Sequence, residues 1–383
     1  MIGNSNGFIM PRDGAGNYFL RDPGAAVDGR PDRGSDQRVT EPSKLTILDV
    51  ARLAGVSRST VSRVMNGKDD VRTEVRARVL QIIDETGFRP SATARSLVSR
   101  RTGVLGLVIP WQVSQLLEDP YFVGLIRGVS RASNAAGTTL SLFLFETAEE
   151  EAELYRRVVA PRLVDGLMLV ALRKDDPLLD EVANSGLPMV SLGRVMHRDD
   201  VSWVDVENYE GSRRAVQHLV GLGHTRIAAI AAPQQMIAGI DRYDGFTEGM
   251  REAGLDPELV EFADWSGDGG YAAMRKLLHH QPTAVFVASD TMAMGALRAI
   301  NDSGLSVPED LAVVGFDGLP ASERSNPPLT TLRQPIPQIG ETLIKILLDQ
   351  IGRKTREPVR KLIPTELIIR ESSSPSHMTQ TPG

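Results

Sequence analysis

Short apolar runs alternate with amphipathic segments from about position 103 to 370. The runs that predict strands lie at 104–110, 139–145, 166–172, 188–193, 226–233, 284–289, 311–317 and 365–372. Because strands of a parallel sheet are covered on both faces, continuous apolar runs of this length favour such strands. Segments with helical spacing lie between them, for example 121–136, 209–222, 245–253 and 292–303. The pattern predicts an α/β doubly wound fold with parallel sheets.

A weak internal repeat divides this part of the chain. Residues 106–137 and 227–255 share the order strand, loop, aromatic residue, glycine, helix, glycine. Two similar subdomains that face each other would form a cleft, fed by the loops at the carboxyl ends of the strands.

A different pattern precedes the strands. Residues 46–55 predict a short helix with Val50, Leu53 and Ala54 facing inward, and Gly55 at its end. Residues 57–67 predict a second helix that buries Val61 and Val64, and 73–86 predict a third with an apolar stripe (Val75, Val79, Ile82 and Ile83). Two short helices joined by a turn with glycine form a helix-turn-helix unit, whose second helix fits the major groove of DNA.

The second helix of this unit leaves polar side chains outward. They are Arg58, Ser59, Thr60, Ser62 and Arg63, all hydrogen-bond donors suited to base edges and phosphates. The alternative is a generic small helical bundle with solvated arginines.

The distribution of charge supports nucleic-acid binding only by the segment 44–101. Residues 44–101 carry 12 Lys and Arg against 6 Asp and Glu, whereas the whole 383-residue chain has a net charge of −6. A basic module on an acidic body is typical of a DNA-binding head on a separate regulatory domain. The chain has no Cys, which excludes disulfides, Cys-based zinc sites and thiol catalysis. It has no apolar run of transmembrane length and no signal-like start, so we expect a cytoplasmic protein without membrane contact.

Three segments lack a core of their own. Residues 1–43 and 372–383 are rich in polar residues, Gly and Pro without periodicity, and predict disordered tails. In 91–101, Ser91 would cap a short helix that carries Arg95 and Leu97. Leu97 either inserts into the minor groove as an apolar wedge or packs on the head.

Several long motifs resemble the lactose-repressor (LacI) family of bacterial transcription regulators. They are DVARLAGVSRSTVSRVMNG (49–67), GFRPSATARSLVSRRTGVLGLVIP (87–110), LVGLGHTRIAAIAAP (219–233), ASDTMAMGALRAINDSGLSVPEDLAVVGFD (288–317) and PPLTTLRQP (327–335). The resemblance implies a helix-turn-helix head at 44–90, a hinge helix and linker at 91–102, and an effector-binding and dimerisation core at 103–371. Within the core it implies an N-subdomain at about 103–205 and 335–363, and a C-subdomain at about 206–333 and 364–371. It also implies a homodimer or tetramer on a near-palindromic operator of double-stranded DNA.

The resemblance assigns DNA-binding residues by position. Arg58, Ser59 and Arg63 would read bases, and Arg95 and Leu97 would lie in the hinge, with Leu97 in the central minor groove. The residues that would contact phosphates are Thr46, Ser57, Thr60, Ser62 and Asn66.

The core resembles periplasmic sugar-binding proteins, with an effector between two subdomains. By position, Tyr121 and Phe122 would form an aromatic wall, Arg242 a polar anchor and Trp265 a stacking platform. Asp317 would accept hydrogen bonds, and Gln334 would contact the effector from a crossover strand. Charged groups and an indole face suit a polyol. The alternatives are core packing for Tyr121 and Phe122 and a partly buried surface aromatic for Trp265.

Two departures from the family leave the effector open. Ser289 and Asp290, which by position would also contact the effector, replace the more usual Asn-Asp, and Gly193-Arg194 stands where several sugar sensors carry Asp. Arg194 would replace that contact or bring an anionic group into range. A sugar, a sugar phosphate and another small polar molecule therefore all remain open, although a carbohydrate is favoured.

The functional hypothesis is a DNA-binding transcriptional regulator, a repressor, whose operator affinity a small polar effector controls. A solute-binding protein is the second class, against which the head and the missing signal peptide argue. An enzyme is the third, and no nucleophile elbow, P-loop, dinucleotide fingerprint or metal-ligand spacing is present. We expect no cofactor, no metal and no catalytic residue, and we interpret His279-His280 as a solvated pair.

Overall fold

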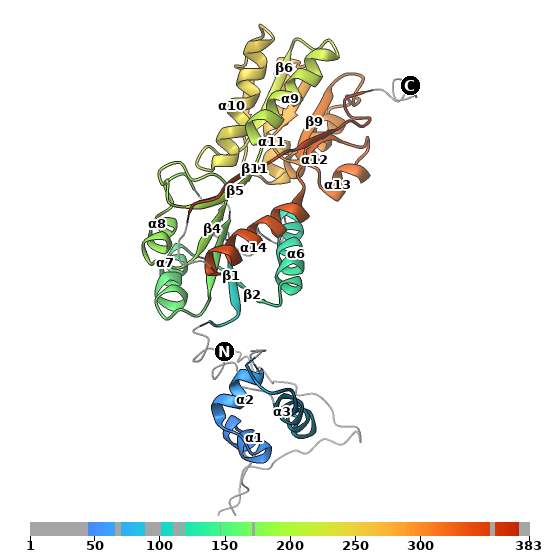
Figure 1. Ribbon diagram of the computed structural model, residues 1–383. Coiled ribbons are helices and arrows are strands. Elements are labelled where there is room, and N and C mark those ends of the chain that lie inside the picture. The colour runs from blue at the N-terminus through green and yellow to red at the C-terminus, as the bar shows by residue number, and fades with distance from the viewer. Residues whose placement is uncertain are drawn as a thin grey trace, which may run out of the picture. The chain divides into compact units, whose positions relative to one another are not determined.

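A computed structural model describes residues 45–65, 70–88, 101–109, 116, 119–145, 147–170, 173–352 and 357–374. Contacts divide the chain into two units, 1–89 and 90–383. The first contains the helical head and the second contains two six-stranded sheets (Figure 1).

The head consists of three helices around a small apolar core. They are α1 (Ile47–Ala54), α2 (Arg58–Met65) and α3 (Thr73–Thr86). Val50, Val61 and Val79 are fully buried among them. Leu53, predicted to face inward, is instead 56% exposed, because the inward stripe of α1 runs through Val50, Ala51 and Ala54.

Local capping explains where α1 begins and ends. The Thr46 side chain accepts a hydrogen bond from the backbone of Asp49, whose carboxylate in turn accepts from the Thr46 backbone, which forms a capping box. This hydrogen bonding, above all from the Thr46 hydroxyl, lowers the pKa of Asp49. Gly55 ends the helix with φ +66°, a left-handed conformation that glycine adopts at little cost. The turn between α1 and α2 therefore follows from the sequence itself.

The first sheet of the core has the order β11-β5-β4-β3-β1-β2, and all its neighbours are parallel. Its strands are β1 (Val104–Ile109), β2 (Thr139–Leu144), β3 (Gly166–Val170), β4 (Met189–Leu192), β5 (Ser202–Val206) and β11 (Arg360–Ile363). The helices α6 (Pro120–Ala135) and α14 (Ile336–Gly352) cover one face. The other face is covered by α7 (Ala148–Leu154), the π-helix η1 (Tyr155–Val159) and α8 (Pro177–Asn184).

The second sheet repeats this plan in the order β12-β10-β9-β8-β6-β7. Its strands are β6 (Ile227–Ala231), β7 (Val260–Phe262), β8 (Ala284–Val287), β9 (Ala312–Asp317), β10 (Thr330–Arg333) and β12 (Glu366–Ile368). Only β12 pairs antiparallel, with β10. The helices α9 (Asn208–Gly221) and α10 (Ile237–Glu252) cover one face, and α11 (Gly267–Leu277) and α12 (Asp290–Asp302) cover the other. The short η2 (Leu278–His280) and α13 (Pro320–Arg324) complete the core.

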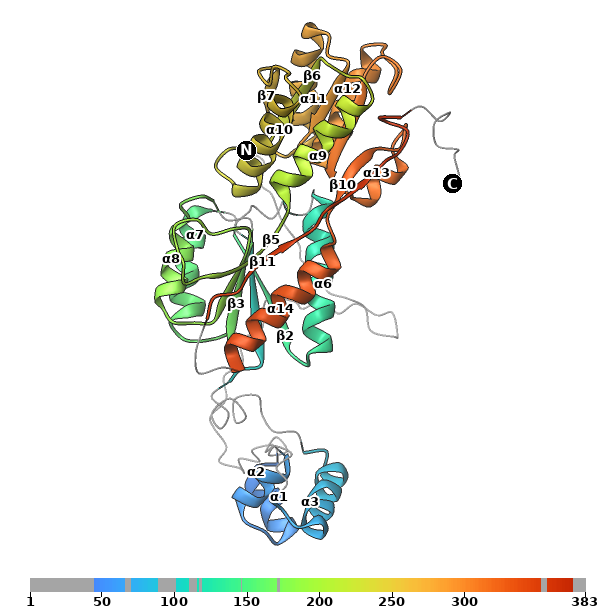
Figure 2. The ribbon, with the colours of Figure 1, turned by 45° about the horizontal axis from the view of Figure 1, so that its top comes forward.

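The chain passes between the two sheets three times. It leaves the first sheet after β5, returns to it through α14 and β11, and enters the second sheet again at β12 (Figure 2). The doubly wound architecture predicted from the sequence is thus confirmed, with the antiparallel β12 as an addition.

The predicted helix at 245–253 is longer in the structure. It begins at Ile237, because Gly239 and Gly245 are not helix breakers but contact points. A Cβ on Gly239 would lie 2.3 Å from the Pro233 carbonyl oxygen, and one on Gly245 would lie 2.1 Å from that of Tyr209. Both glycines therefore let the helix approach neighbouring backbone closely.

The prediction of a disordered tail from position 372 is wrong for its first residues. Ser372, Ser373 and Ser374 are buried. The Ser372 hydroxyl donates to the Val313 carbonyl (2.6 Å) and accepts from the Thr330 amide (2.8 Å). The composition of this segment is polar, but the Ser372 hydroxyl bonds to buried backbone groups. A rule based on composition alone does not detect such anchoring.

Candidate functional site

The second helix of the head presents polar side chains to solvent. Arg58, Ser59 and Arg63 are exposed, and Thr60 and Ser62 are half-buried. Arg63 faces Asp70 at 3.8 Å, a contact between two largely exposed side chains that costs little to break. The surface of α2 therefore presents exposed polar groups that suit a polyanion.

Two predicted phosphate contacts also cap helices. The Thr46 hydroxyl belongs to the capping box of α1, and the Ser57 hydroxyl accepts from the Thr60 amide at 3.1 Å. Both residues lie at the surface of the head, so capping leaves them accessible. Asn66, Arg95 and Leu97, together with the predicted hinge helix, lie outside the described residues, and their roles stay predictions.

The core contains a cavity between its two sheets. Its volume is about 640 Å³ including the part open to solvent. We call it the core cavity; its lining residues are Asp119, Tyr121, Phe122, Val170, Leu192, Gly193, Asp205, Val206, Asn208, Met236, Ala238, Arg242, Trp265, Asp317 and Gln334. Most of them follow the carboxyl ends of parallel strands or begin the next helix, which is where ligands meet open α/β sheets.

Six of the nine predicted effector contacts line the core cavity. They are Tyr121, Phe122, Arg242, Trp265, Asp317 and Gln334. Tyr121 and Phe122 meet edge to face, with ring centroids 5.4 Å apart, at the start of α6. Asp317 (φ +115°) and Trp265 (φ +73°) hold backbone conformations that non-glycine residues rarely adopt. Such conformations gather at ligand sites, where surrounding structure maintains them.

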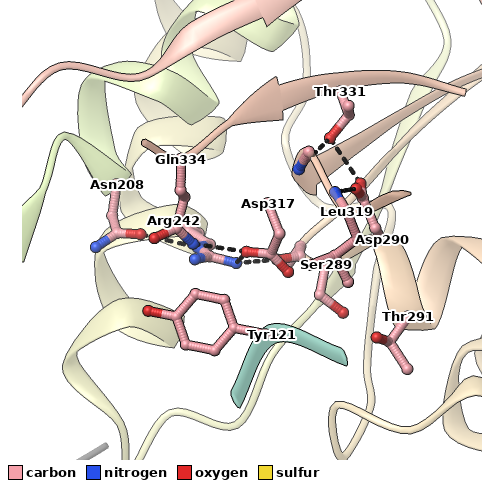
Figure 3. Close-up of polar contacts among 12 residues, drawn as sticks. Tyr121, Asn208, Arg242, Ser289, Asp290, Thr291, Asp317, Leu319, Thr331 and Gln334 are labelled. Carbon is pink, nitrogen blue, oxygen red and sulfur yellow. Dashed lines mark hydrogen bonds and ion pairs between the residues drawn. The ribbon is translucent and has the colours of Figure 1, made fainter. Parts of the chain in front are cut away.

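Arg242 is the centre of a buried polar network. Its Nε donates to the Asn208 side-chain oxygen (2.9 Å), and its Nη1 donates to the Ala288 carbonyl (2.5 Å). The same Nη1 lies 3.0 Å from Asp317 Oδ1, which also accepts from Gln334 Nε2 at 2.7 Å. Figure 3 shows these side chains in a row, with the Tyr121 ring beside the ion pair. The network fixes the orientation of both charges in the cavity wall.

Burial governs the ionisation of the cavity carboxylates. Loss of hydration raises the pKa of Asp317, although the Arg242 guanidinium opposes this shift. Burial likewise raises the pKa of Asp205 to about 6, although the carboxylate accepts hydrogen bonds from the Arg194 and Val206 amides. The pKa of Asp119 is also raised by burial. Cavity carboxylates with raised pKa values are typical of functional sites.

Three predicted contacts do not line the core cavity. Ser289 caps α12 by accepting from the Met292 amide (3.1 Å). Asp290 lies fully buried behind Asp317, where it accepts from Thr331 Oγ1 (2.6 Å) and the Leu319 amide (2.7 Å). Burial, then the charge of Asp317, raises the pKa of Asp290. These side chains are used by the fold itself, which is the physical reason that they are not available to a ligand.

The third predicted contact that does not line the core cavity, Arg194, spans the cleft instead. It follows β4 in the first sheet, and its Nε donates to Asp241 of α10 at 3.1 Å while Nη2 contacts the other carboxylate oxygen. Two further contacts cross the cleft: the Lys174 amide donates to the Gln235 carbonyl (2.8 Å), and Thr291 Oγ1 lies 3.4 Å from Asp119 Oδ1. The two halves of the core are thus joined around the cavity.

Sequence reasoning missed Asp119, Asp205 and Asn208. Asp205 is the last residue but one of β5, a strand that we did not predict because Ser202 and Asp205 interrupt its apolar run. An Asp at a strand end followed by Asn208 at a helix start was an available signal. Asp119 caps α6 by accepting from the Tyr121 amide (3.0 Å), and the Asp-Pro pair before the helix was the signal there.

In the described part of the chain, no helix is long and apolar enough to cross a membrane. Likewise, no group of three or more His, Cys, Asp or Glu in the described ranges could hold a metal ion.

Comparisons with known families match both parts of the chain. Residues 46–91 match the family described as bacterial regulatory proteins, lacI family. Residues 216–373 match the periplasmic binding protein-like domain.

Characterised relatives are similar over most of the chain. The HTH-type transcriptional regulator CelR of Thermobifida fusca is 41% identical over 333 residues, which cover 85% of this chain and 98% of that protein. The ribose operon repressor of Halalkalibacterium halodurans is 36% identical over 330 residues, 86% of this chain and 97% of the other.

Solved structures agree. The CelR–cellobiose complex is 39% identical, covers 86% of this chain and 100% of its own, and has a TM-score of 0.69. The lac repressor dimer bound to operator and the anti-inducer ONPF is 29% identical, covers 86% and 99%, and has a TM-score of 0.75. The chain therefore belongs to the lacI family of bacterial regulatory proteins and is a DNA-binding transcriptional regulator.

Proposed function

We propose that this protein represses transcription by binding a near-palindromic operator in the cytoplasm as a homodimer, with α2 of each head in a major groove. The observation that carries the proposal is the exposed, donor-rich surface of α2 on a correctly capped helix-turn-helix. Arginine side chains in this position suit bidentate contacts to guanine. The lac repressor structure, a dimer on its operator, supports the symmetry.

We further propose that a carbohydrate effector binds in the core cavity and changes the relation between the two halves of the core. The aromatic wall, the Arg242–Asp317 pair and Trp265 supply apolar faces and hydrogen-bonding groups, which together suit a sugar ring. Two similar proteins, CelR in its complex with cellobiose and the ribose operon repressor, support a sugar. Through the hinge at 91–102, ligand and operator would influence each other's binding reciprocally.

Operator selection from random DNA, followed by footprinting, tests the first proposal. We expect a symmetric protected site and a steep loss of affinity with rising salt. Arg58→Ala should weaken specific binding about 10- to 100-fold, the range for an arginine that reads a base. Arg156→Ala removes the same charge from an exposed position in the core and should leave operator affinity unchanged.

Two results would contradict the proposal that α2 reads an operator. Without any sequence-specific site, the repressor proposal fails. If both Ala variants weaken binding alike, α2 is not the reading surface. Leu97→Ala adds a test of the hinge: a wedge requires specific binding to fall far more than non-specific binding.

A further inference from the structure

The core cavity is rich in negative charge. Three of its lining residues are aspartates, namely Asp119, Asp205 and Asp317, and among the described lining residues only Arg242 is cationic. Arg194, which the sequence offered as an anion partner, does not line the cavity and is already held by both oxygens of Asp241. The balance of charge thus opposes an anionic ligand.

Arg242 offsets only part of this charge. Its Nε and Nη1 are held by the Asn208 side chain, the Ala288 carbonyl and Asp317. Its Cζ also lies 3.8 Å from the centroid of the Phe316 ring, so one face of the guanidinium is covered. A phosphate in the cavity would have to compete with Asp317 for a cation that is only 5% exposed.

Hydrogen-bonding capacity points the same way. Asp119 uses Oδ1 for the Tyr121 amide and Thr291, and no partner of its Oδ2 occurs among the described residues. Gln334 donates to Asp317, which leaves its side-chain oxygen as an acceptor. The Trp265 indole N–H is a buried donor without a partner in the described part of the chain. The Asp119 Oδ2 and Gln334 oxygens are thus acceptors that suit a ligand that brings donors.

Hydroxyl groups supply such donors, whereas a dianionic phosphate supplies none. A phosphate ester would set acceptor against acceptor and charge against like charge in a half-buried site. On this basis, and resting on the carbohydrate effector proposed above, we propose that Asp119 and Asp205 make the core cavity selective for an uncharged, hydroxyl-rich sugar and against its phosphate esters.

The experiment measures thermal stabilisation of the full-length protein by matched pairs of ligands. The pairs are glucose, ribose and cellobiose, each with its own phosphate ester, titrated at pH 7.5 and constant ionic strength. We expect at least one uncharged sugar to stabilise the protein, and its ester to need at least about 100-fold more ligand for the same shift, since like charges brought together in a binding site cost several factors of ten.

Asn variants locate the selectivity. Asp119→Asn retains the oxygen that caps α6 but removes the charge, and we expect discrimination against the ester to fall at least about tenfold. Asp205→Asn should act in the same direction. The matched control is Asp176→Asn, because Asp176 also precedes a proline and caps a helix, α8, but does not line the cavity. Its discrimination should equal that of the parent protein.

The outcomes separate this inference from the proposed function. An ester that stabilises the parent protein at a lower concentration than its sugar overturns the inference but leaves a carbohydrate effector in place. If no member of the panel stabilises a protein that still binds its operator, the carbohydrate effector itself is wrong. If Asp119→Asn and Asp205→Asn discriminate as well as Asp176→Asn, these two aspartates do not determine the selectivity.

Discussion

The buried pair of Arg242 and Asp317 should dominate the stability of the cavity wall. Their side chains are 5% and 7% exposed, and Nη1 lies 3.0 Å from Oδ1. Arg242→Met leaves a buried carboxylate unpaired and deprives the Asn208 oxygen and the Ala288 carbonyl of a donor. Breaking one side of a buried ion pair costs roughly 3–5 kcal/mol. We therefore expect a loss of about 4 kcal/mol in the free energy of unfolding.

A double-mutant cycle with Asp317→Asn tests the reason for that loss. In the double variant, which carries both Arg242→Met and Asp317→Asn, the carboxylate that needed the guanidinium is gone. The double variant should then be little less stable than Arg242→Met alone, with a coupling energy of at least about 2 kcal/mol. Urea unfolding followed by circular dichroism, with linear extrapolation to water, measures all four proteins.

An exposed pair of similar length is the control. Arg298 Nη2 lies 2.9 Å from Asp268 Oδ1, but the side chains are 56% and 91% exposed. Solvent screens such pairs, so the cycle of Arg298→Met and Asp268→Asn should show no coupling beyond error. If the Arg242 and Asp317 effects simply add, or if the exposed pair couples equally, the reasoning from burial is refuted.

Three further predictions concern stability. Because burial raises the pKa of Asp205 from 3.8 to about 6, its ionisation opposes folding by roughly 3 kcal/mol at pH 7. That penalty disappears as pH falls through about 6 towards 4. The parent should therefore gain stability relative to Asp205→Asn in urea unfolding measured across this pH range. Parallel curves of stability against pH for the two proteins would contradict the assignment. A Cβ on Gly295 would lie 1.7 Å from the Gly267 carbonyl oxygen, so Gly295→Ala should cost about 1–3 kcal/mol or more, whereas Gly221→Ala, with nothing within 4 Å, should not destabilise. Ser372→Ala removes two buried hydrogen bonds and should cost about 1–3 kcal/mol by the same assay; an unchanged midpoint would show that the segment is not anchored.

Local rules predicted much of the head. The end of α1 at Gly55 and the bounds of α3 were predicted from neighbours in the sequence, whereas the Thr46 capping box was not. Leu53 was misplaced because a helix of eight residues has few positions to define its inward face, and packing against the other two helices decides it.

In the core, the sequence predicted aliphatic strands and missed polar ones. The buried runs of β1, β3 and β9 were evident, but β5 contains Ser202, Trp203 and Asp205, and β11 begins with Arg360. Whether a polar residue in a strand is buried depends on partners from distant segments. No local pattern contains those partners.

The sequence by itself determined which kind of protein this is: a basic helix-turn-helix head, an α/β core with two similar halves, and most of the polar and aromatic side chains expected in the cavity. The tertiary structure alone decided which charges face that cavity. Arg194 was offered as a ligand contact, yet Asp241, 47 positions away, holds it across the cleft. Asp290 was also predicted to contact the effector, yet Thr331 and the Leu319 amide bind it behind the cavity wall. The physical reason is that a buried charge is stabilised by partners brought together only by folding, so its availability to a ligand is a property of the assembled core.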